Sequence, residues 1–153
     1  TPLIQKNFFI KHQCGSGNFE KVNKFYSNTS SSDLNLNYTV KEFFESPEEC
    51  IAWADLIISR AGALTLSEIS AMEKGAFMIP LPSSIDNHQY LNAKNHEKIG
   101  LGITHEESDS SENLMKKLSD VIEKHRYLDW ENVKKDMIHI KAANNIYEFI
   151  KKN

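Results

Sequence analysis

Length, composition and charge place this chain among ordinary globular proteins and exclude several other classes. Its 153 residues suffice for one hydrophobic core and are too few for two, so we expect a single domain, and a formal net charge of −3 gives no sign of a nucleic-acid partner. No apolar run reaches the roughly 18 residues of a membrane-spanning helix and no secretion signal is recognisable, so we expect a cytoplasmic protein.

The first part of the chain alternates between strand and helix patterns. Residues 8–12 (FFIKH) predict a strand, and apolar residues at helical spacing predict a helix over 19–26. A second strand is predicted over 38–43. The sequence SPEE at 46–49 then has the form of a capping box, with serine as the N-cap, proline at the first helical position and glutamate three residues after the cap.

The stretch 55–68 (DLIISRAGALTLSE) is the one around which the other elements are arranged. Three apolar residues at 56–58 predict a strand buried on both faces, and Gly62 ends this run. From Ala63 the pattern becomes helical, with apolar residues three apart on one face. These apolar residues are Leu66, Ile69 and Met72.

The alternation continues to the end of the chain. Residues 76–81 (AFMIPL) predict another buried strand, and Asp86 is predicted to be the N-cap of the helix that follows. Residues 101–103 predict a short strand, Asp109 is the predicted cap of the next helix, and helical spacing continues over 130–149. This order of elements predicts an α/β fold with a parallel, doubly wound sheet.

The cysteines and acidic residues show no pattern of a metal or redox site. Cys14 and Cys50 lie outside any CxxC motif or Cys/His cluster with ligand spacing, so we predict that both are reduced thiols. The chain has no Asp-x-Asp motif and no pair of carboxylates with the spacing of a general acid and base. We therefore predict no metal and no cofactor.

A buried strand that turns through Gly62 directly into a helix predicts an anion site. The first amides of a helix have no intrahelical acceptor, and the helix dipole adds partial positive charge there. Phosphate is the most common ligand of such a site, although most turns of this kind bind nothing. Glu68, one turn into the helix, could accept hydrogen bonds from two vicinal hydroxyls such as those of a ribose. Alternatively, it is a solvated first-turn residue that the helix dipole favours.

Two blocks of sequence resemble a known family. They are ADLIISRAGALTLSEIS at 54–70 and, after a strand that ends in Pro80, DNHQYLNA at 86–93. Both are similar to the C-terminal domain of the MurG family, bacterial transferases that place N-acetylglucosamine on lipid I during peptidoglycan synthesis, and the similarity runs from about Phe8 to the end. It implies a B-type glycosyltransferase of two domains, in which the C-terminal, Rossmann-like domain holds UDP-N-acetylglucosamine.

The resemblance implies a role for each residue that matches the family's motifs. Glu68 matches the acid that binds the ribose hydroxyls, and Phe44 lies where the family's main chain pairs with the uracil edge. His88 and Gln89 match a polar pair that binds the hydroxyls of N-acetylglucosamine, a pair that is Gln-Gln in some members. Arg60 matches an arginine that lies near the phosphates or braces the turn. The segment that meets the diphosphate and completes the substrate-binding set is Gly62, Ala63, Leu64, Thr65, Leu66 and Ser67.

Two parts of the family's architecture are missing from the sequence. The family's C-terminal domain opens with a strand and a glycine-rich GGSxGA loop, and no such segment precedes Thr1. The N-terminal domain, which in the family binds the lipid I acceptor, carries the proposed base and contacts the membrane, is missing too. We therefore expect residues 1–153 to be a sugar-nucleotide-binding fragment, inactive alone, whose sheet has a gap or rearranged strands. The full-length protein is expected on the inner face of the cell membrane.

Other interpretations stay open at this point. The chain is alternatively a nucleotide-binding or interaction module without catalysis, or part of a related transferase that uses another UDP-sugar or lipid acceptor. His88 is equally well explained as an exposed helix residue. The other histidines lack ligand spacing and are predicted to lie at the surface: His96, His105, His125 and His139. The large aromatic residues are predicted in the core or an interface: Phe8, Phe9, Trp53, Phe77 and Trp130.

Overall fold

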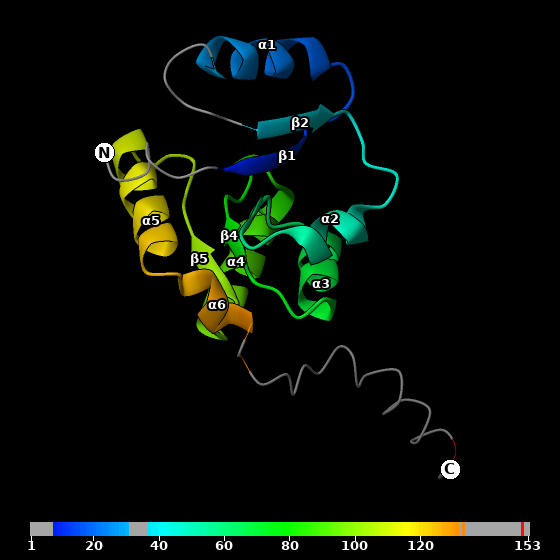
Figure 1. Cartoon of the computed structure of the whole chain (residues 1–153). Coiled ribbons are helices and arrows are strands. Elements are labelled where there is room, and N and C mark those ends of the chain that lie inside the picture. The colour runs from blue at the N-terminus through cyan, green and yellow to red at the C-terminus, as the bar shows by residue number, and fades with distance from the viewer. Residues whose placement is uncertain (1–7, 31–36, 132, 134–150, 152–153) are drawn as a thin grey trace. The chain divides into compact units, whose positions relative to one another are not determined.

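The computed structural model describes residues 8–30, 37–131, 133 and 151. The chain divides into two compact units, Thr1–Cys50 and Ile51–Asn153, and each is described by itself. Figure 1 labels the helices and strands of both units. Most of the predicted C-terminal helix over 130–149 lies outside the described residues.

The first unit is a pair of parallel strands with a helix between them in sequence. β1 (Phe9–Gln13) pairs with β2 (Asn37–Lys41), and α1 (Phe19–Ser30) connects them. The ring of Tyr26 on α1 stacks on that of Tyr38 on β2, with ring centroids 4.9 Å apart. The strand and helix predicted over 8–12 and 19–26 are thereby confirmed.

The second strand is shorter than predicted. It ends at Lys41, and Phe43 lies beyond it with 63% of its surface exposed. Its partner β1 ends at Gln13, and Gly15 then turns the chain with a φ of 75° that favours glycine. Because the pairing partner turns away, the regular strand stops two residues before the apolar pattern does.

The second unit holds a sheet of three parallel strands in the order β3-β4-β5. The strands are β3 (Ile57–Ser59), β4 (Ala76–Met78) and β5 (Gly102–Thr104). The helices are α2 (Pro47–Trp53), which begins in the first unit, α3 (Ala63–Ala71), α4 (His88–Lys98), α5 (Ser111–Glu123) and α6 (Arg126–Glu131), with a short 3-10 helix η2 (Ile85–Asn87) before α4.

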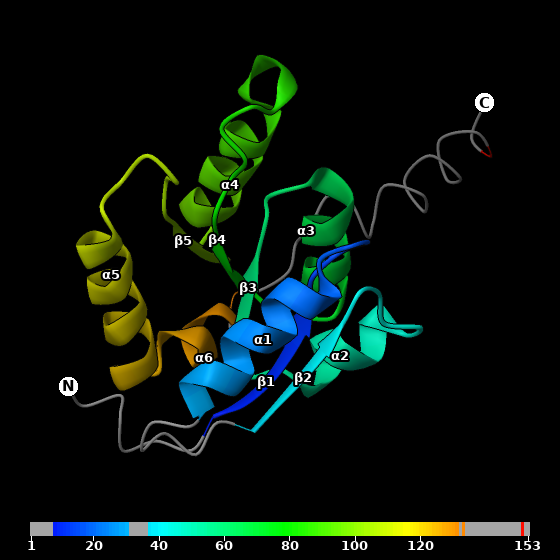
Figure 2. The same ribbon diagram turned by 90° about the horizontal axis from the view of Figure 1, so that it is seen from above.

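Helices cover both faces of this sheet, as Figure 2 shows. On one face, α3 and α4 pack on β4 through a buried cluster of Ala61, Leu66, Ile69, Ala76, Met78 and Ala93. On the other face, α5 and α6 pack on it through Phe77, Val121 and Trp130. Alternate residues of β4 thus enter opposite cores. The predicted α/β class with parallel strands is confirmed, and among the described residues these strands form two sheets instead of a continuous one.

Two helix caps differ from the prediction. The N-cap of α4 is Asn87, not Asp86, and both residues have positive φ, 56° and 47°, which Asn and Asp tolerate better than other residues. The N-cap of α5 is Ser110, not Asp109: the Ser110 hydroxyl accepts a hydrogen bond from the amide of Asn113 at 3.2 Å. Asp109 accepts one from the Asn113 side chain instead, at 2.6 Å.

Burial also differs from the prediction at a few positions. His105 is only 3% exposed, because its amide extends the sheet by donating to the carbonyl of Met78 and its ring stacks near Phe77. Phe9 and Trp53 are exposed, whereas Phe77 and Trp130 lie in the core as predicted. The ends of the strands therefore bury polar groups that hydrophobic patterning alone did not reveal.

Candidate functional site

The carboxyl ends of the three strands in the second unit lie level with one another. Ser59, Met78 and Thr104 are partners in the register, and each is the last residue of its strand. The segments that follow the three strands therefore leave the sheet at one edge. In open α/β sheets this edge is where ligands bind.

Several polar atoms at this edge have no partner among the described residues. Among the described residues, three buried side-chain atoms have no hydrogen-bond partner: Ser59 Oγ, Thr104 Oγ1 and His105 Nδ1. Ser59 and Thr104 end β3 and β5, and His105 follows β5. Buried polar atoms are usually paired, so the carboxyl edge is unusually polar for the end of a packed sheet.

The start of α3 presents unpaired amides at the same edge. Gly62 is its N-cap, and no side-chain cap is found in the part of the chain that the structure describes. The first bond of the helix runs from the amide of Leu66 to the carbonyl of Gly62, at 3.0 Å. The amides of the three exposed residues between them precede that bond and lack an intrahelical acceptor. These residues are Ala63, Leu64 and Thr65.

Gly62 has a conformation that any residue could adopt. Its φ and ψ are −66° and 138°, which is ordinary extended backbone. A Cβ built on Gly62 would meet no atom within 4 Å. Neither the backbone nor the packing of the described residues requires glycine at this position, so the space beside the turn is open to a ligand that approaches the backbone closely.

Two residues of the predicted diphosphate segment differ in their surroundings. The side chain of Leu66 belongs to the core and is 1% exposed, and its amide is engaged by Gly62. Ser67 is exposed on the helix. The structure thus gives Leu66 a packing role and leaves Ser67 accessible.

Glu68 lies farther along α3 than the helix-dipole interpretation requires. It is the sixth residue of the helix, and the first turn holds no acidic residue. Its side chain is exposed on the face opposite the buried Leu66 and Ile69 cluster. Because dipole effects fall off within the first turn, the dipole alone does not explain a carboxylate at this position.

Arg60 braces the edge of the sheet. Its Nη1 donates to Oε2 of Glu107 at 2.6 Å and to the carbonyl of Ile79 at 3.2 Å. It therefore joins the end of β3 to the segments that follow β4 and β5. The hydrogen bond from Arg60 and its positive charge lower the pKa of the Glu107 carboxyl. Both contacts brace the carboxyl edge of the sheet, and the role near the phosphates that the resemblance implies stays a prediction.

The start of α4 holds the other pair of predicted residues. The amide of Leu81 donates to Oε1 of Gln89 at 2.9 Å, and the Gln89 amide donates to Ser84 Oγ at 3.4 Å, so Gln89 fastens the loop after β4. His88 is the first residue of the helix, and its side chain is 68% exposed. Its Nε2 lies 3.9 Å from Oδ2 of Asp86.

Asn92 is a positioning residue that sequence reasoning missed. Its Nδ2 donates to the carbonyl of Ala61 at 3.2 Å, which ties the second turn of α4 to the residue before Gly62. The starts of α3 and α4 are linked through this bond. The signal in the sequence was a polar residue three positions after Gln89, inside the block at 86–93.

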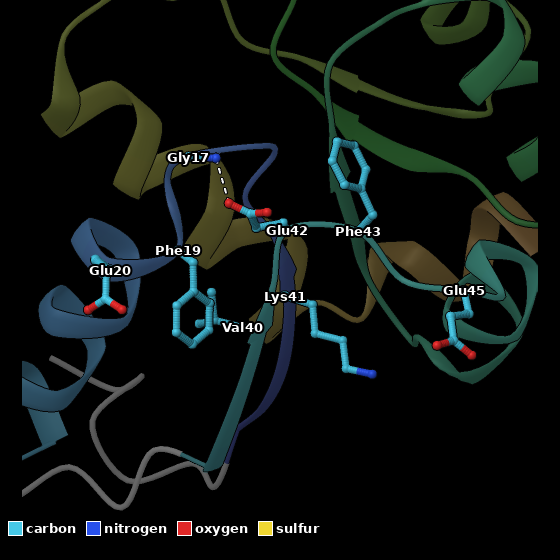
Figure 3. Close-up of a pocket in the computed structure, with 8 residues that line it drawn as sticks. All are labelled: Gly17, Phe19, Glu20, Val40, Lys41, Glu42, Phe43 and Glu45. Atoms are coloured by element: carbon cyan, nitrogen blue, oxygen red, sulfur yellow. Dashed lines mark hydrogen bonds between the residues drawn. The ribbon is translucent and has the colours of Figure 1, made fainter.

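Phe44 belongs to the first unit, three residues after β2. Its amide donates to Oε1 of Gln13 at 3.1 Å, and Lys41 Nζ lies 5.7 Å from the centroid of its ring. The neighbouring residues line an open cavity of about 750 Å³ at the carboxyl ends of β1 and β2, shown in Figure 3. The Gly17 amide donates to Oε1 of Glu42 across it, at 2.5 Å. The lining residues are Gly17, Phe19, Glu20, Val40, Lys41, Glu42, Phe43 and Glu45.

The described ranges hold neither a metal-binding cluster nor a membrane-spanning helix. No group of three or more His, Cys, Asp or Glu side chains there is arranged to hold a metal ion. No helix in those ranges is long and apolar enough to cross a membrane. Cys14 and Cys50 are free thiols, as predicted.

Comparison with known proteins points to one group of transferases. The chain is 38% identical over 159 residues to the UDP-N-acetylglucosamine--N-acetylmuramyl-(pentapeptide) pyrophosphoryl-undecaprenol N-acetylglucosamine transferase of Rickettsia bellii, covering 97% of this chain and 43% of that protein. The protein of the same name from Wolbachia pipientis is 34% identical over 151 residues, covering 97% and 42%. The chain thus spans less than half the length of these curated relatives.

A solved structure agrees with these sequence relatives. The crystal structure of Acinetobacter baumannii MurG matches with a TM-score of 0.80 and 27% identity, covering 97% of this chain and 42% of that one. The family model of the glycosyltransferase family 28 C-terminal domain matches residues 1–151, nearly the whole sequence. The chain therefore belongs to the glycosyltransferase family 28 C-terminal domain family.

Proposed function

We propose that this chain is the donor-binding domain of an inverting glycosyltransferase that moves N-acetylglucosamine from UDP-N-acetylglucosamine to lipid I, forming lipid II in peptidoglycan synthesis. The names of the curated relatives and the family membership support this proposal. Acceptor and membrane contacts would be made outside the residues that the structure describes, at the cytoplasmic face of the membrane.

The observation that carries the proposal is the uncapped start of α3 at the level carboxyl edge of the sheet. Three amides precede the first helical bond there, and a Cβ on the adjacent Gly62 would meet no atom within 4 Å. A diphosphate suits such amides because it is anionic and has many acceptor oxygens. In this proposal Glu68 binds the ribose hydroxyls, and His88 and Gln89 contact the sugar from the start of α4.

The chemistry assigned to this domain is stabilisation of the leaving group. An acceptor hydroxyl oxygen would attack the anomeric carbon while the bond from that carbon to the β-phosphate oxygen breaks, and the hydroxyl proton would pass to a base. Negative charge then grows on the diphosphate of UDP. Fixed amide dipoles near the diphosphate would stabilise this growing charge, so they would favour the transition state more than the ground state, which is the condition for catalysis.

Phe44 is proposed to contact the nucleobase through its main chain. The Phe44 carbonyl is the acceptor available for a base edge, because the Phe44 amide already donates to Gln13. If the base paired with both the amide and the carbonyl of Phe44, the amide would have to give up its hydrogen bond to Gln13. Binding of the base therefore includes an exchange of one hydrogen bond in this proposal.

The test is the affinity of the full chain for UDP, measured by titration calorimetry. We expect Glu68→Ala to weaken UDP binding by about 1 to 3 kcal/mol, the usual loss for a hydrogen-bonded charged partner. Glu112→Ala, which removes an exposed carboxylate from the first turn of α5, is the matched control and should leave UDP affinity unchanged.

Two results would contradict the assignment. Equal UDP affinities of Glu68→Ala and the unmodified chain would remove Glu68 from the site, and no UDP binding by any variant would remove the site itself. Titrations with UDP-N-acetylglucosamine, UDP-glucose and UDP-galactose identify the donor. A preference for one of the last two would indicate a related transferase with another UDP-sugar.

A further inference from the structure

Arg60 is two residues before Gly62 in the chain, and its charge is paired with Glu107. Its side chain extends along the carboxyl edge of the sheet and donates to the carbonyl of Ile79 and the carboxylate of Glu107. Both of its acceptors follow neighbouring strands. The guanidinium therefore lies beside the segments that follow β4 and β5, where the carboxylate of Glu107 offsets its charge.

The pair between Arg60 and Glu107 can exchange partners. The two side chains are 49% and 48% exposed, so water and dissolved ions reach both of them. Only Nη1 donates in the described contacts, whereas a guanidinium has five donors in a planar fork. Exposed ion pairs are weak, and phosphate is a bidentate acceptor for arginine, so an anion bound at the turn can compete with a single carboxylate.

We infer that Glu107 is a positioning residue that holds Arg60 beside Ile79 and offsets its charge, so that a diphosphate at the α3 turn must compete with Glu107 for the guanidinium. This inference rests on the proposed function, because it assigns the anion to the same turn. It makes Glu107 a residue that lowers the affinity for the phosphate part of the ligand. The hydrogen bond and the charge of Arg60 lower the pKa of the Glu107 carboxyl.

The experiment compares Glu107→Gln with the neighbouring Glu106→Gln in the full chain. Both residues are exposed glutamates in the segment after β5, but the ion pair of Arg60 is with Glu107. We expect Glu107→Gln to bind UDP about twofold to fivefold more tightly at low salt, the factor that matches the usual strength of an exposed ion pair. The gain should shrink at high salt because exposed charges are then screened.

Uridine is the second probe, because it has the base and ribose of UDP without a phosphate. A purely structural role for Glu107 would change the affinities for uridine and UDP together. The proposed role changes only that for UDP. In an Arg60→Met background, Glu107→Gln should tighten UDP binding no more than Glu106→Gln does, because the guanidinium that it releases is absent.

Each outcome decides between these possibilities. Tighter UDP binding by Glu107→Gln alone, with uridine affinity unchanged, supports the inference. An equal gain with Glu106→Gln, or no gain, overturns it and leaves the proposed function standing as long as the unmodified chain binds UDP. No UDP binding by the unmodified chain overturns both.

Discussion

Glu97 joins α4 to β5 through two hydrogen bonds of one carboxylate. Its Oε2 accepts from Lys94 Nζ at 2.8 Å, and its Oε1 accepts from the amide of Thr104 at 3.0 Å. Partial burial would raise the pKa of Glu97, but the bonds from Lys94 and Thr104 outweigh it and the pKa is lowered. The bond to Glu97 likewise raises the pKa of Lys94, against a smaller opposing effect of burial.

The sign of these shifts fixes a pH dependence of stability. A lowered carboxyl pKa stabilises the fold above the unfolded value of about 4.3, and this contribution is lost as the pH falls through the folded pKa. Glu97→Gln should therefore cost about 1 kcal/mol near pH 7, a charged hydrogen bond discounted for its partial exposure. The cost should shrink as the pH falls through the lowered folded pKa of Glu97, below which the native carboxyl is protonated too. Urea unfolding across this range measures it, and a cost that stays constant with pH would contradict the assignment.

At the scale of the element, the start of α5 depends on the N-cap Ser110. Ser110 supplies the side-chain oxygen that meets the amide of Asn113. Ser110→Ala should lower the free energy of unfolding by about 1 kcal/mol, the usual loss of an N-cap. Ser111→Ala, one position later and already helical, is the control and should be neutral or slightly stabilising because alanine favours helix interiors. Urea unfolding followed by circular dichroism measures both, and a larger loss for Ser111→Ala would place the cap elsewhere.

Hydrophobic spacing predicted which elements exist better than where they begin. The strand at 8–12, the strand predicted over 76–81, which ends at Met78, and the helix after Gly62 follow from period and burial, which are properties of the local sequence. Caps are less certain, because neighbouring polar residues are alternative candidates: Ser110 accepts from the backbone amide of Asn113, whereas Asp109 accepts from its side chain. The side chain that reaches the amide depends on backbone angles that the sequence pattern does not contain.

At the scale of the whole molecule, the sequence predicted those parts of the candidate site that lie within one continuous segment. The turn at Gly62 and the start of its helix follow each other in the chain, so their geometry is local. Gln13 and Glu107 were missed because their partners, Phe44 and Arg60, lie 31 and 47 residues away along the chain. Such pairs exist only once parallel strands bring their ends to one edge.

The second unit depends on a close approach at Gly75, just before β4. A Cβ on Gly75 would lie 2.6 Å from the carbonyl oxygen of Leu101 and 2.6 Å from Cβ of Trp130, so it would push the start of β5 and α6 away from the residue before β4. Gly75→Ala should destabilise the unit by about 1 to 3 kcal/mol, the usual cost of overpacking a core. Trp130, which is 5% exposed, reports on this contact through its fluorescence during urea unfolding.

Gly62→Ala is the matched control for Gly75→Ala, because a Cβ on Gly62 meets no atom within 4 Å. Its free energy of unfolding should stay within about 0.5 kcal/mol of the unmodified chain, as for surface substitutions without a special backbone role. If the two variants lost equal stability, the cost would come from replacing glycine itself, and the tight packing of β4, β5 and α6 would not be its cause. If only Gly75→Ala unfolds more easily, the packing of the fold requires glycine at 75 and does not require it at 62.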